Sequence, residues 1–107
     1  MPFSIRFTEN AEQDLEDIYV YISSHGFPEK AYYVIEKIEE RIMSLSELPE
    51  RGYIIKELSE LGITEYREIF FKSYRIIYKI SDNTAYIMII ADGRRDMQTL
   101  LQRVLLK

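Results

Sequence analysis

Residues 66–91 read YREIFFKSYRIIYKISDNTAYIMIIA, and this stretch decides the fold that the sequence predicts. It is rich in β-branched and aromatic residues, which favour strands. It is interrupted at Lys72 and Ser73 and again at residues 81–84, where Ser, Asp, Asn and Thr favour a turn. We therefore expect three consecutive strands joined by two tight connections, as in an antiparallel sheet.

The predicted strands differ in which faces they bury. The middle one alternates, with Tyr74, Ile76, Tyr78 and Ile80 on one face. The last one, residues 85–91, is apolar at every position. It should therefore be central in the sheet and covered on both sides.

The first 50 residues predict one strand and two helices. Apolar and polar residues alternate over residues 3–7, as in a strand with one buried face. Thr8 fits as an N-cap, Gly26 as a helix stop, and Pro28 as the first residue of a second helix that ends at Pro49. Both helices carry one apolar stripe: Ala11, Leu15, Ile18 and Ile22 in the first, and Ala31, Ile35, Ile38, Ile42 and Leu45 in the second. Two such helices with a short turn predict an antiparallel helical hairpin.

The fold class that follows is α+β. Residues 96–106 predict a short final helix, so the element order is β-α-α-β-β-β-α. The helical hairpin would pack on one face of a mainly antiparallel sheet. The 107 residues fit a single domain over 1–107. We expect the final segment to cover part of the other face or to stay partly free for a partner.

Composition and charge narrow the function classes. The chain has no cysteine, so disulfides and thiolate metal sites are ruled out. No stretch reaches the roughly 18 apolar residues of a membrane helix, and the alternating start predicts no signal peptide, so we expect a cytoplasmic protein with no membrane partner. The net charge of −4 divides into −7 for residues 1–50 and +3 for residues 51–107. The acidic total charge disfavours general nucleic-acid binding. The basic second half fits a local anionic partner, and the alternative is that the helices simply carry acidic solvent faces.

Standard catalytic signatures are missing from the sequence. His25, the single histidine, falls in the predicted turn between the helices. Neither a Ser-His-Asp arrangement nor a His-based metal site can be built around it. We therefore expect no metal and no cofactor.

The segment D-G-R-R-D at residues 92–96 stands out because it follows the most buried strand. Gly93 can make a sharp exit from the sheet, and Asp96 can cap the last helix. Arginine is a forked donor suited to phosphate or carboxylate. We expect one target-binding patch at the end of the sheet, formed by Arg67, Arg75, Arg94 and Arg95. The alternative is that at least one arginine pairs with Asp92, Asp96 or Glu68 and locks the corner.

Four segments together resemble the RelE/ParE superfamily of toxins from bacterial type II toxin–antitoxin pairs. They are residues 11–22, with AEQDL at the start; YRE at 66–68; YRIIY at 74–78; and DGRRD at 92–96. Their order and spacing run across nearly the whole chain. The resemblance implies growth inhibition, a role in plasmid stabilization, and neutralisation by an antitoxin that wraps the toxin with an extended or helical segment.

The resemblance leaves the target open. RelE-like members cleave messenger RNA on the ribosome without a metal, and Arg75 and Arg95 would then be catalytic. That branch's C-terminal tyrosine position falls near Leu100 or Leu101, so a proton acceptor is not evident. ParE-like members inhibit DNA gyrase by binding, and the arginine corner, the missing acid–base set and the acidic total charge favour this branch. A third option is a degenerate member that binds its antitoxin and poisons nothing.

The C-terminal segment also predicts a partner surface. Its apolar side exceeds what a short helix needs for itself, so we expect it to bind the antitoxin, with a homodimer as the competing use. The residues concerned are Leu100, Leu101, Val104 and Leu105.

Overall fold

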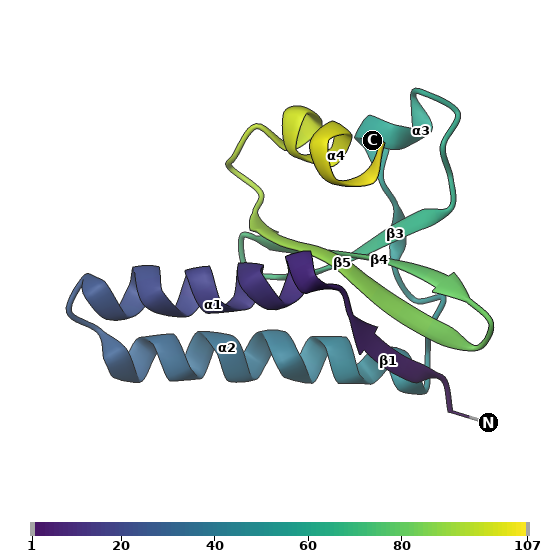
Figure 1. Ribbon diagram of the computed structural model, residues 1–107. Coiled ribbons are helices and arrows are strands. Elements are labelled where there is room, and N and C mark those ends of the chain that lie inside the picture. Colours follow the sequence, from purple (N-terminus) through teal and green to yellow (C-terminus); the bar gives the residue numbers. More distant parts are fainter. Residues whose placement is uncertain (1, 107) are drawn as a thin grey trace.

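The computed structural model describes residues 2–106 and shows helices on both faces of one sheet (Figure 1). Its five strands lie in the order β1-β5-β4-β3-β2. Among residues 2–106, only β1 and β5 pair in parallel, so the expected α+β class and mainly antiparallel sheet are confirmed. In chain order the elements are β1 (Ser4–Phe7), α1 (Glu9–Ser24), α2 (Pro28–Met43), a 3₁₀ turn η1 (Ser44–Ser46), β2 (Tyr53–Ile54), α3 (Lys56–Ser59), β3 (Tyr66–Phe71), β4 (Tyr74–Ser81), β5 (Thr84–Asp92) and α4 (Met97–Leu105).

The local signals for helix ends and turns act as the sequence predicts. The Thr8 side chain accepts a hydrogen bond from the Ala11 amide at the start of α1. Pro28 opens α2, and Gly26 just before it has a φ of 87° that glycine adopts without strain. One boundary is wrong, because α2 ends at Met43 and tightens into η1 well before Pro49.

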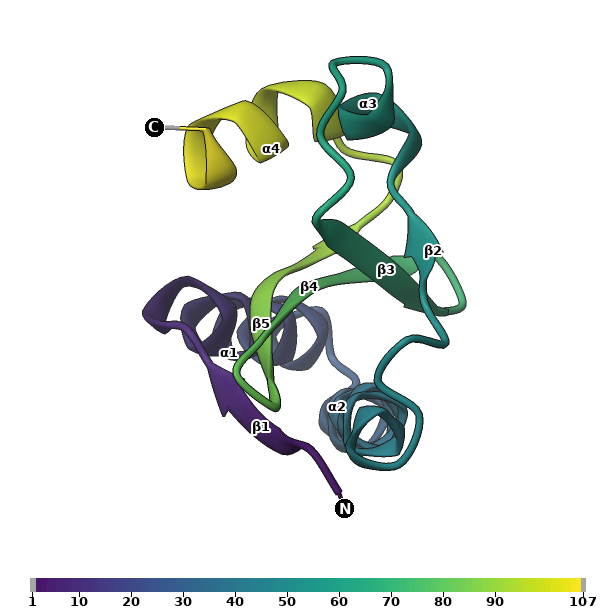
Figure 2. The ribbon, with the colours of Figure 1, turned by 90° about the vertical axis from the view of Figure 1, so that its right-hand side faces the viewer.

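Two apolar cores lie on opposite faces of the sheet. The α1–α2 hairpin covers one face, where Ile38, Ile42 and Tyr78 are fully buried. Helices α3 and α4 cover the other face (Figure 2). Strand β5 supplies both cores, with Ile87 on the hairpin side and Ile89 on the opposite side. Its predicted central position, covered on both faces, is therefore confirmed.

Two elements were not predicted from the sequence. Strand β2 pairs with β3 over two residues only, and α3 is a single turn. These two elements are stabilised by packing, because Ile55 and Leu58 are almost completely enclosed in the core beneath α4. In α2, the predicted apolar stripe included Ile35. The structure instead buries Val34 and leaves Ile35 half-buried. Among residues 2–106, no helix combines the length and apolar character needed to cross a bilayer.

Helix α1 is attached to the half of β5 that β1 does not reach. Strand β1 pairs with β5 only as far as Ile87. A bulge follows, since Tyr78 pairs with Ile87 and its neighbour Ile77 with Ile89. Beyond it the Met88 carbonyl accepts from Asn10 Nδ2 at 3.0 Å, and the Ile90 amide donates to an Asp14 carboxylate oxygen at 2.9 Å. Helix side chains thus take the place of a neighbouring strand.

A first prediction concerns Gly52, which lies against Tyr78. The Tyr78 hydroxyl accepts from the Gly52 amide at 3.0 Å and donates to the Pro49 carbonyl at 2.7 Å. A Cβ at residue 52 would come within 2.5 Å of that hydroxyl oxygen. We expect Gly52→Ala to lower the free energy of unfolding by about 1–3 kcal/mol, measured in denaturant melts. The control Ser59→Ala, at an exposed site, should stay within about 0.5 kcal/mol, and an equal midpoint for both variants would contradict the prediction.

Candidate functional site

The arginine corner, residues 92–96, is a rigid turn between β5 and α4. The Gly93 amide donates to the Ser73 carbonyl at 2.7 Å, which ties the corner to the β3–β4 turn. The Asp96 side chain accepts from the Thr99 amide at 3.1 Å and so caps α4, as expected. Backbone contacts at both ends therefore fix where the two arginines are presented.

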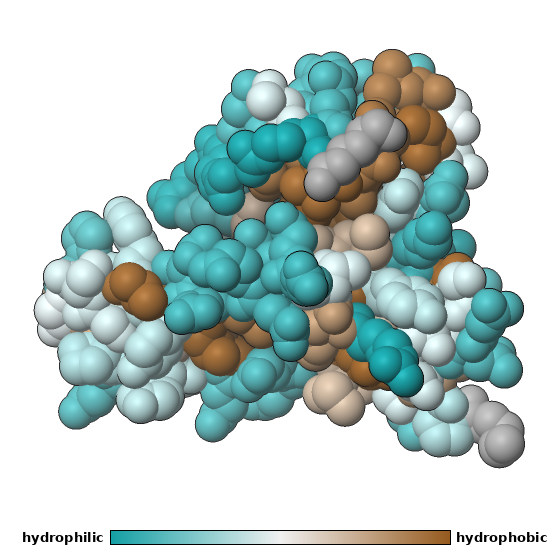
Figure 3. All heavy atoms as spheres, viewed as in Figure 1, coloured by the Kyte–Doolittle hydropathy of each residue, from teal (hydrophilic) through white to brown (hydrophobic). Residues whose placement is uncertain are grey.

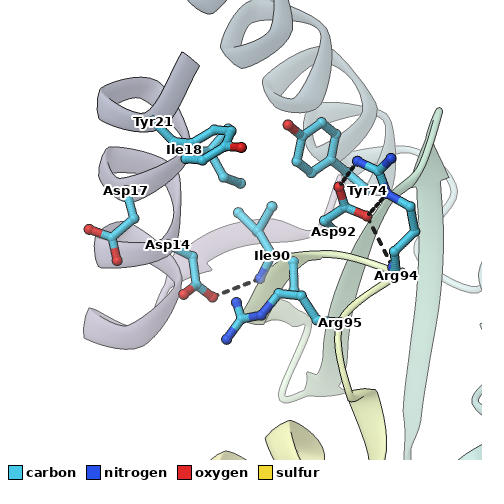
Figure 4. A pocket seen from close by; sticks show the side chains of 10 residues that line it. Asp14, Asp17, Ile18, Tyr21, Tyr74, Ile90, Asp92, Arg94 and Arg95 are labelled. Carbon is cyan, nitrogen blue, oxygen red and sulfur yellow. Dashed lines mark hydrogen bonds and ion pairs between the residues drawn. The ribbon is translucent and has the colours of Figure 1, made fainter. Parts of the chain in front are cut away.

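Beside the corner lies a pocket of about 410 Å³ between α1 and the end of β5. Its α1 wall carries two carboxylates and a tyrosine, and its β5 wall carries the arginines (Figure 4). The floor includes apolar atoms of both elements. The lining residues are Asp14, Asp17, Ile18, Tyr21, Tyr74, Ile90, Ala91, Asp92, Arg94 and Arg95.

The two arginines of the corner are in different states. Arg94 is held by Asp92, with Nε to Oδ1 at 3.0 Å and Nη2 to Oδ2 at 2.5 Å, and this lowers the pKa of Asp92. In residues 2–106 no ion pair engages Arg95, whose side chain reaches across the pocket towards Asp14 (Figure 4). Arg95 is therefore the arginine at this site whose fork is available to a partner.

Asp14 places a carboxylate in the α1 wall of the pocket. Burial raises the pKa of its carboxyl, and the hydrogen bond from the Ile90 amide and the nearby Arg95 charge oppose that rise. The pocket thus offers an acidic wall on α1 facing a basic wall at the corner. A partner that bound in this pocket would need side chains of both signs to complement its walls.

Arg75 is enclosed in an ion cluster on the other face of the sheet. Its Nε donates to Glu68 at 2.6 Å, and its two terminal nitrogens donate to both oxygens of Glu57 at 2.8 and 2.9 Å. The Arg75 side chain is only 13% exposed. A Cβ on Gly93 would lie 2.9 Å from Arg75 Cδ, so the arginine stem supports the corner from beneath and explains why glycine stands there.

The expected patch of four arginines does not form. Arg67 alternates with Glu68, the partner of Arg75, and its own guanidinium donates to the carbonyls of Glu50 and Gly52. Because neighbouring strand residues point to opposite faces, Arg67 and Arg75 are separated by the sheet. Only Arg94 and Arg95 share the pocket. The alternative that arginines pair with Asp92 and Glu68 is what the structure shows.

The leucines expected to bind the antitoxin are mostly covered by the protein itself. Leu100 and Leu101 are 6% and 1% exposed in the core beneath α4. Val104 and Leu105 are half-buried at its margin. Hydrophobic surface still gathers around α3 and α4 (Figure 3). A partner would reach Leu100 and Leu101 only by moving α4.

The sequence did not indicate two parts of the site. The first is the α1 wall, for which the only signal is the spacing of Asp14, Ile18 and Tyr21 along one side of the helix. The second is Glu57, which lies on the unpredicted helix α3. His25 is exposed in the interhelical turn as expected, where its ring packs on Tyr21 at 4.2 Å between centroids. No cluster of three or more metal-binding side chains occurs in the described part of the chain.

Comparisons with known proteins agree with this architecture. Residues 5–97 match the family model described as the ParE toxin of the type II toxin–antitoxin system parDE. No curated protein sequence matches at a significant level. Among solved structures, a chain of the chromosomal ParDE system from P. aeruginosa has a TM-score of 0.70 at 19% identity, covering 84% of this chain and 95% of that one.

Two further structures share the fold. A chain of the RelBE2 toxin–antitoxin complex from Mycobacterium tuberculosis has a TM-score of 0.63 at 23% identity, covering 86% of this chain and 92% of that one. A mutant of the E. coli toxin RelE in the free state has a TM-score of 0.64 at 15% identity, covering 98% and 100%.

The helical hairpin on a mainly antiparallel sheet is therefore the fold of these solved toxins, and the family model assigns the chain to the class of type II toxins. Because the family model spans most of its length, the chain belongs to the ParE toxin family of type II toxin–antitoxin systems.

A second prediction concerns the acid response of the Arg75 cluster. The Arg75 fork lowers the pKa of Glu57 from 4.5 to about 2. A carboxyl whose pKa is lowered by folding stabilises the folded state at pH values above its pKa in the unfolded chain. That stability is lost as the pH falls through the pKa of the folded state. We expect wild type to lose about 1–2 kcal/mol more than Glu57→Gln between about pH 5 and pH 2, after allowing for solvent screening.

The measurement is the free energy of unfolding from urea melts across that pH range. Burial raises the pKa of Glu68, and the nearby Glu57 charge adds to that rise, so Glu57→Gln also changes the contribution of Glu68. The difference between wild type and variant therefore reports the Glu57–Arg75 pair together with its coupling to Glu68. Parallel pH profiles would show that the Glu57–Arg75 pair adds nothing.

Proposed function

We propose that this protein is a ParE-like toxin that inhibits DNA gyrase by binding and uses no catalytic group of its own. The observation that carries the proposal is the division of the arginines. Arg75 is locked between two carboxylates, and Arg95 lies free at a pocket that Arg75 does not line.

The geometry around Arg75 argues against the RelE-like alternative. Cleavage of RNA needs cations on the reacting phosphate and a group that accepts the proton of the 2′-hydroxyl. Arg75 and Arg95 belong to opposite sides of the β5–α4 corner, and two carboxylates already satisfy the guanidinium of Arg75. Tyr74, the tyrosine beside the corner, has a pKa raised by burial and by Asp92, so it is a poor base near neutral pH.

The pocket supports binding as the mode of action. Its two tyrosines and its apolar floor offer contact area, and its charges fix the orientation of a partner. Arg95, with the aspartates of α1 opposite, would pair with a carboxylate of the target surface. Arg94, held by Asp92, would shape the rim.

A third prediction tests this site with purified gyrase. We expect Arg95→Ala to raise the concentration needed for half-maximal inhibition of supercoiling about tenfold or more, because a charge-assisted hydrogen bond is lost. The control Lys79→Ala removes a cation that pairs only weakly with Glu65, at 3.8 Å, and should inhibit like wild type. Both variants should stay folded with at most a small shift of the unfolding temperature, because Arg95 acts on Asp14 only through its charge and Lys79 stands 5.9 Å from the centre of the Tyr66 ring.

Expression without antitoxin decides between the alternatives. Growth arrest with broken DNA and intact transcripts is expected. Arrest with intact DNA and cut messages, abolished by Arg95→Ala, would instead assign the RelE-like activity. Normal growth with a folded protein would leave the third option, a module that binds its antitoxin without toxicity.

A further inference from the structure

Three cations from two elements converge on two aromatic rings beside the β3–β4 turn. Lys37 Nζ and Lys72 Nζ stand 5.7 and 5.9 Å from the centre of the Tyr33 ring. The Arg41 guanidinium stands 5.6 Å from the Phe71 ring, and Lys72 stands 5.7 Å from the same ring. Such contacts hold the cations in place without neutralising them.

Among residues 2–106, one of these three cations has a carboxylate partner. Lys37 meets only Glu40, at 3.4 Å on the exposed surface of α2. Within residues 2–106 neither Arg41 nor Lys72 forms an ion pair. A cluster of positive charge therefore lies beside the edge of the sheet, in a protein whose total charge is −4.

The opposite side of the same edge is apolar and exposed. Tyr53 and Phe70 pack with ring centres 6.1 Å apart, and they are 67% and 39% exposed. Phe70 follows Ile69, which is buried towards the hairpin, so the Phe70 ring points to the other face. Exposed aromatic pairs of this kind are typical of interaction surfaces.

The backbone between the two sides is an incompletely paired strand edge. Strand β2 pairs only with Arg67 and Glu68, so residues 69–71 of β3 extend past it. The Phe70 carbonyl is engaged by Arg41 Nη1 at 3.2 Å, a contact that a partner's amide could replace. Figure 2 shows this edge of the sheet, with α2 beneath it and seen end-on.

An extended segment beside residues 69–71 would direct alternate side chains to the two faces. One set would meet Lys37, Arg41 and Lys72, and the other would meet Tyr53 and Phe70. Complementarity therefore demands carboxylates that alternate with apolar side chains.

Other occupants match this surface less well. Nucleic acid bound by stacking would find cations already standing over Tyr33 and Phe71, which leaves Tyr53 and Phe70 as the rings of this edge without a cation. A second copy would have to offer an acidic strand, yet the other edge strand, β1, exposes Ser4 and Arg6. Because Leu100 and Leu101 are buried, the leucine surface that the sequence predicted on α4 is smaller than expected.

We propose that this aromatic–cation edge, formed by Tyr33, Lys37, Arg41, Lys72, Tyr53 and Phe70, docks a segment of the antitoxin with alternating acidic and apolar residues. The proposal rests on the proposed function only in that the chain is the toxin of a pair. The antitoxin is the product of the gene paired with this one.

The experiment compares three proteins for binding to the purified antitoxin by calorimetry. We expect the triple variant K37E/R41E/K72E to bind at least about a hundredfold more weakly, with a smaller salt dependence between about 50 and 300 mM NaCl. The matched control K56E/K79E/R103E makes the same change of charge on other surfaces and should keep the wild-type affinity. An unchanged dissociation constant for the triple variant would overturn the proposal.

A second variant covers the apolar side and guards against misfolding. Tyr53→Ser with Phe70→Ser should weaken antitoxin binding at least about tenfold, while leaving the salt dependence as in wild type. Both variants should keep the wild-type circular dichroism spectrum, because the altered side chains are exposed or line the edge. If the triple variant does not fold, the Tyr53 and Phe70 variant alone decides, and its wild-type affinity would overturn the proposal.

Toxicity separates this inference from the proposed function. In cells the triple variant should still arrest growth, and co-expressed antitoxin should no longer rescue them. A variant that loses toxicity but binds antitoxin normally would assign the edge to the target and overturn the inference. Two other outcomes would also overturn the inference. One is that the wild-type protein self-associates and the triple variant does not. The other is that the triple variant loses RNA binding but keeps its affinity for the antitoxin.

Discussion

The second half of β5 has no strand beside it on the β1 side, and the geometry of the candidate site depends on how the backbone groups of this half are hydrogen-bonded. Unpaired buried backbone groups are costly, so an incomplete sheet edge must find other partners. Asn10 and Asp14 supply them from α1, at Met88 and Ile90. The helix is thereby fixed at the height where β5 turns into the arginine corner, and the space left between them is the pocket.

A second constraint divides the arginines between structure and surface. Arg75 joins α3, β3 and β4 through Glu57 and Glu68, and removing one partner of such an enclosed ion cluster typically costs about 3–5 kcal/mol. Its stem also fills the space beneath Gly93. Arg75 therefore supports the backbone of the corner with its stem, and its charge is paired with carboxylates inside the protein. Arg95 carries the charge that faces outward.

Much of the fold follows from local chemistry that sequence displays directly. Periodicity predicted the hairpin and the three-stranded meander, and Thr8, Pro28 and Asp96 marked helix starts correctly. Strand β2 and α3 escaped prediction because each has too few residues for a period and is held by tertiary burial. The arginine patch failed for a related reason. The prediction placed Arg67 and Arg75 together because they lie on neighbouring strands. In the observed register Arg67 pairs with Tyr78 and Arg75 with Phe70, so the two arginine side chains point to opposite faces of the sheet.

The β3–β4 turn brings the two charged surfaces of the protein into one neighbourhood. Lys72 belongs to the aromatic–cation edge, and the adjacent Ser73 carbonyl holds the Gly93 amide of the corner at 2.7 Å. Lys72 adopts a φ of 52°, so this turn has a fixed and uncommon shape. A segment bound along the edge would therefore end beside the arginine corner, within reach of its exposed charges. If both proposals hold, occupation of the edge would hinder access to the pocket by proximity, without any change in the fold.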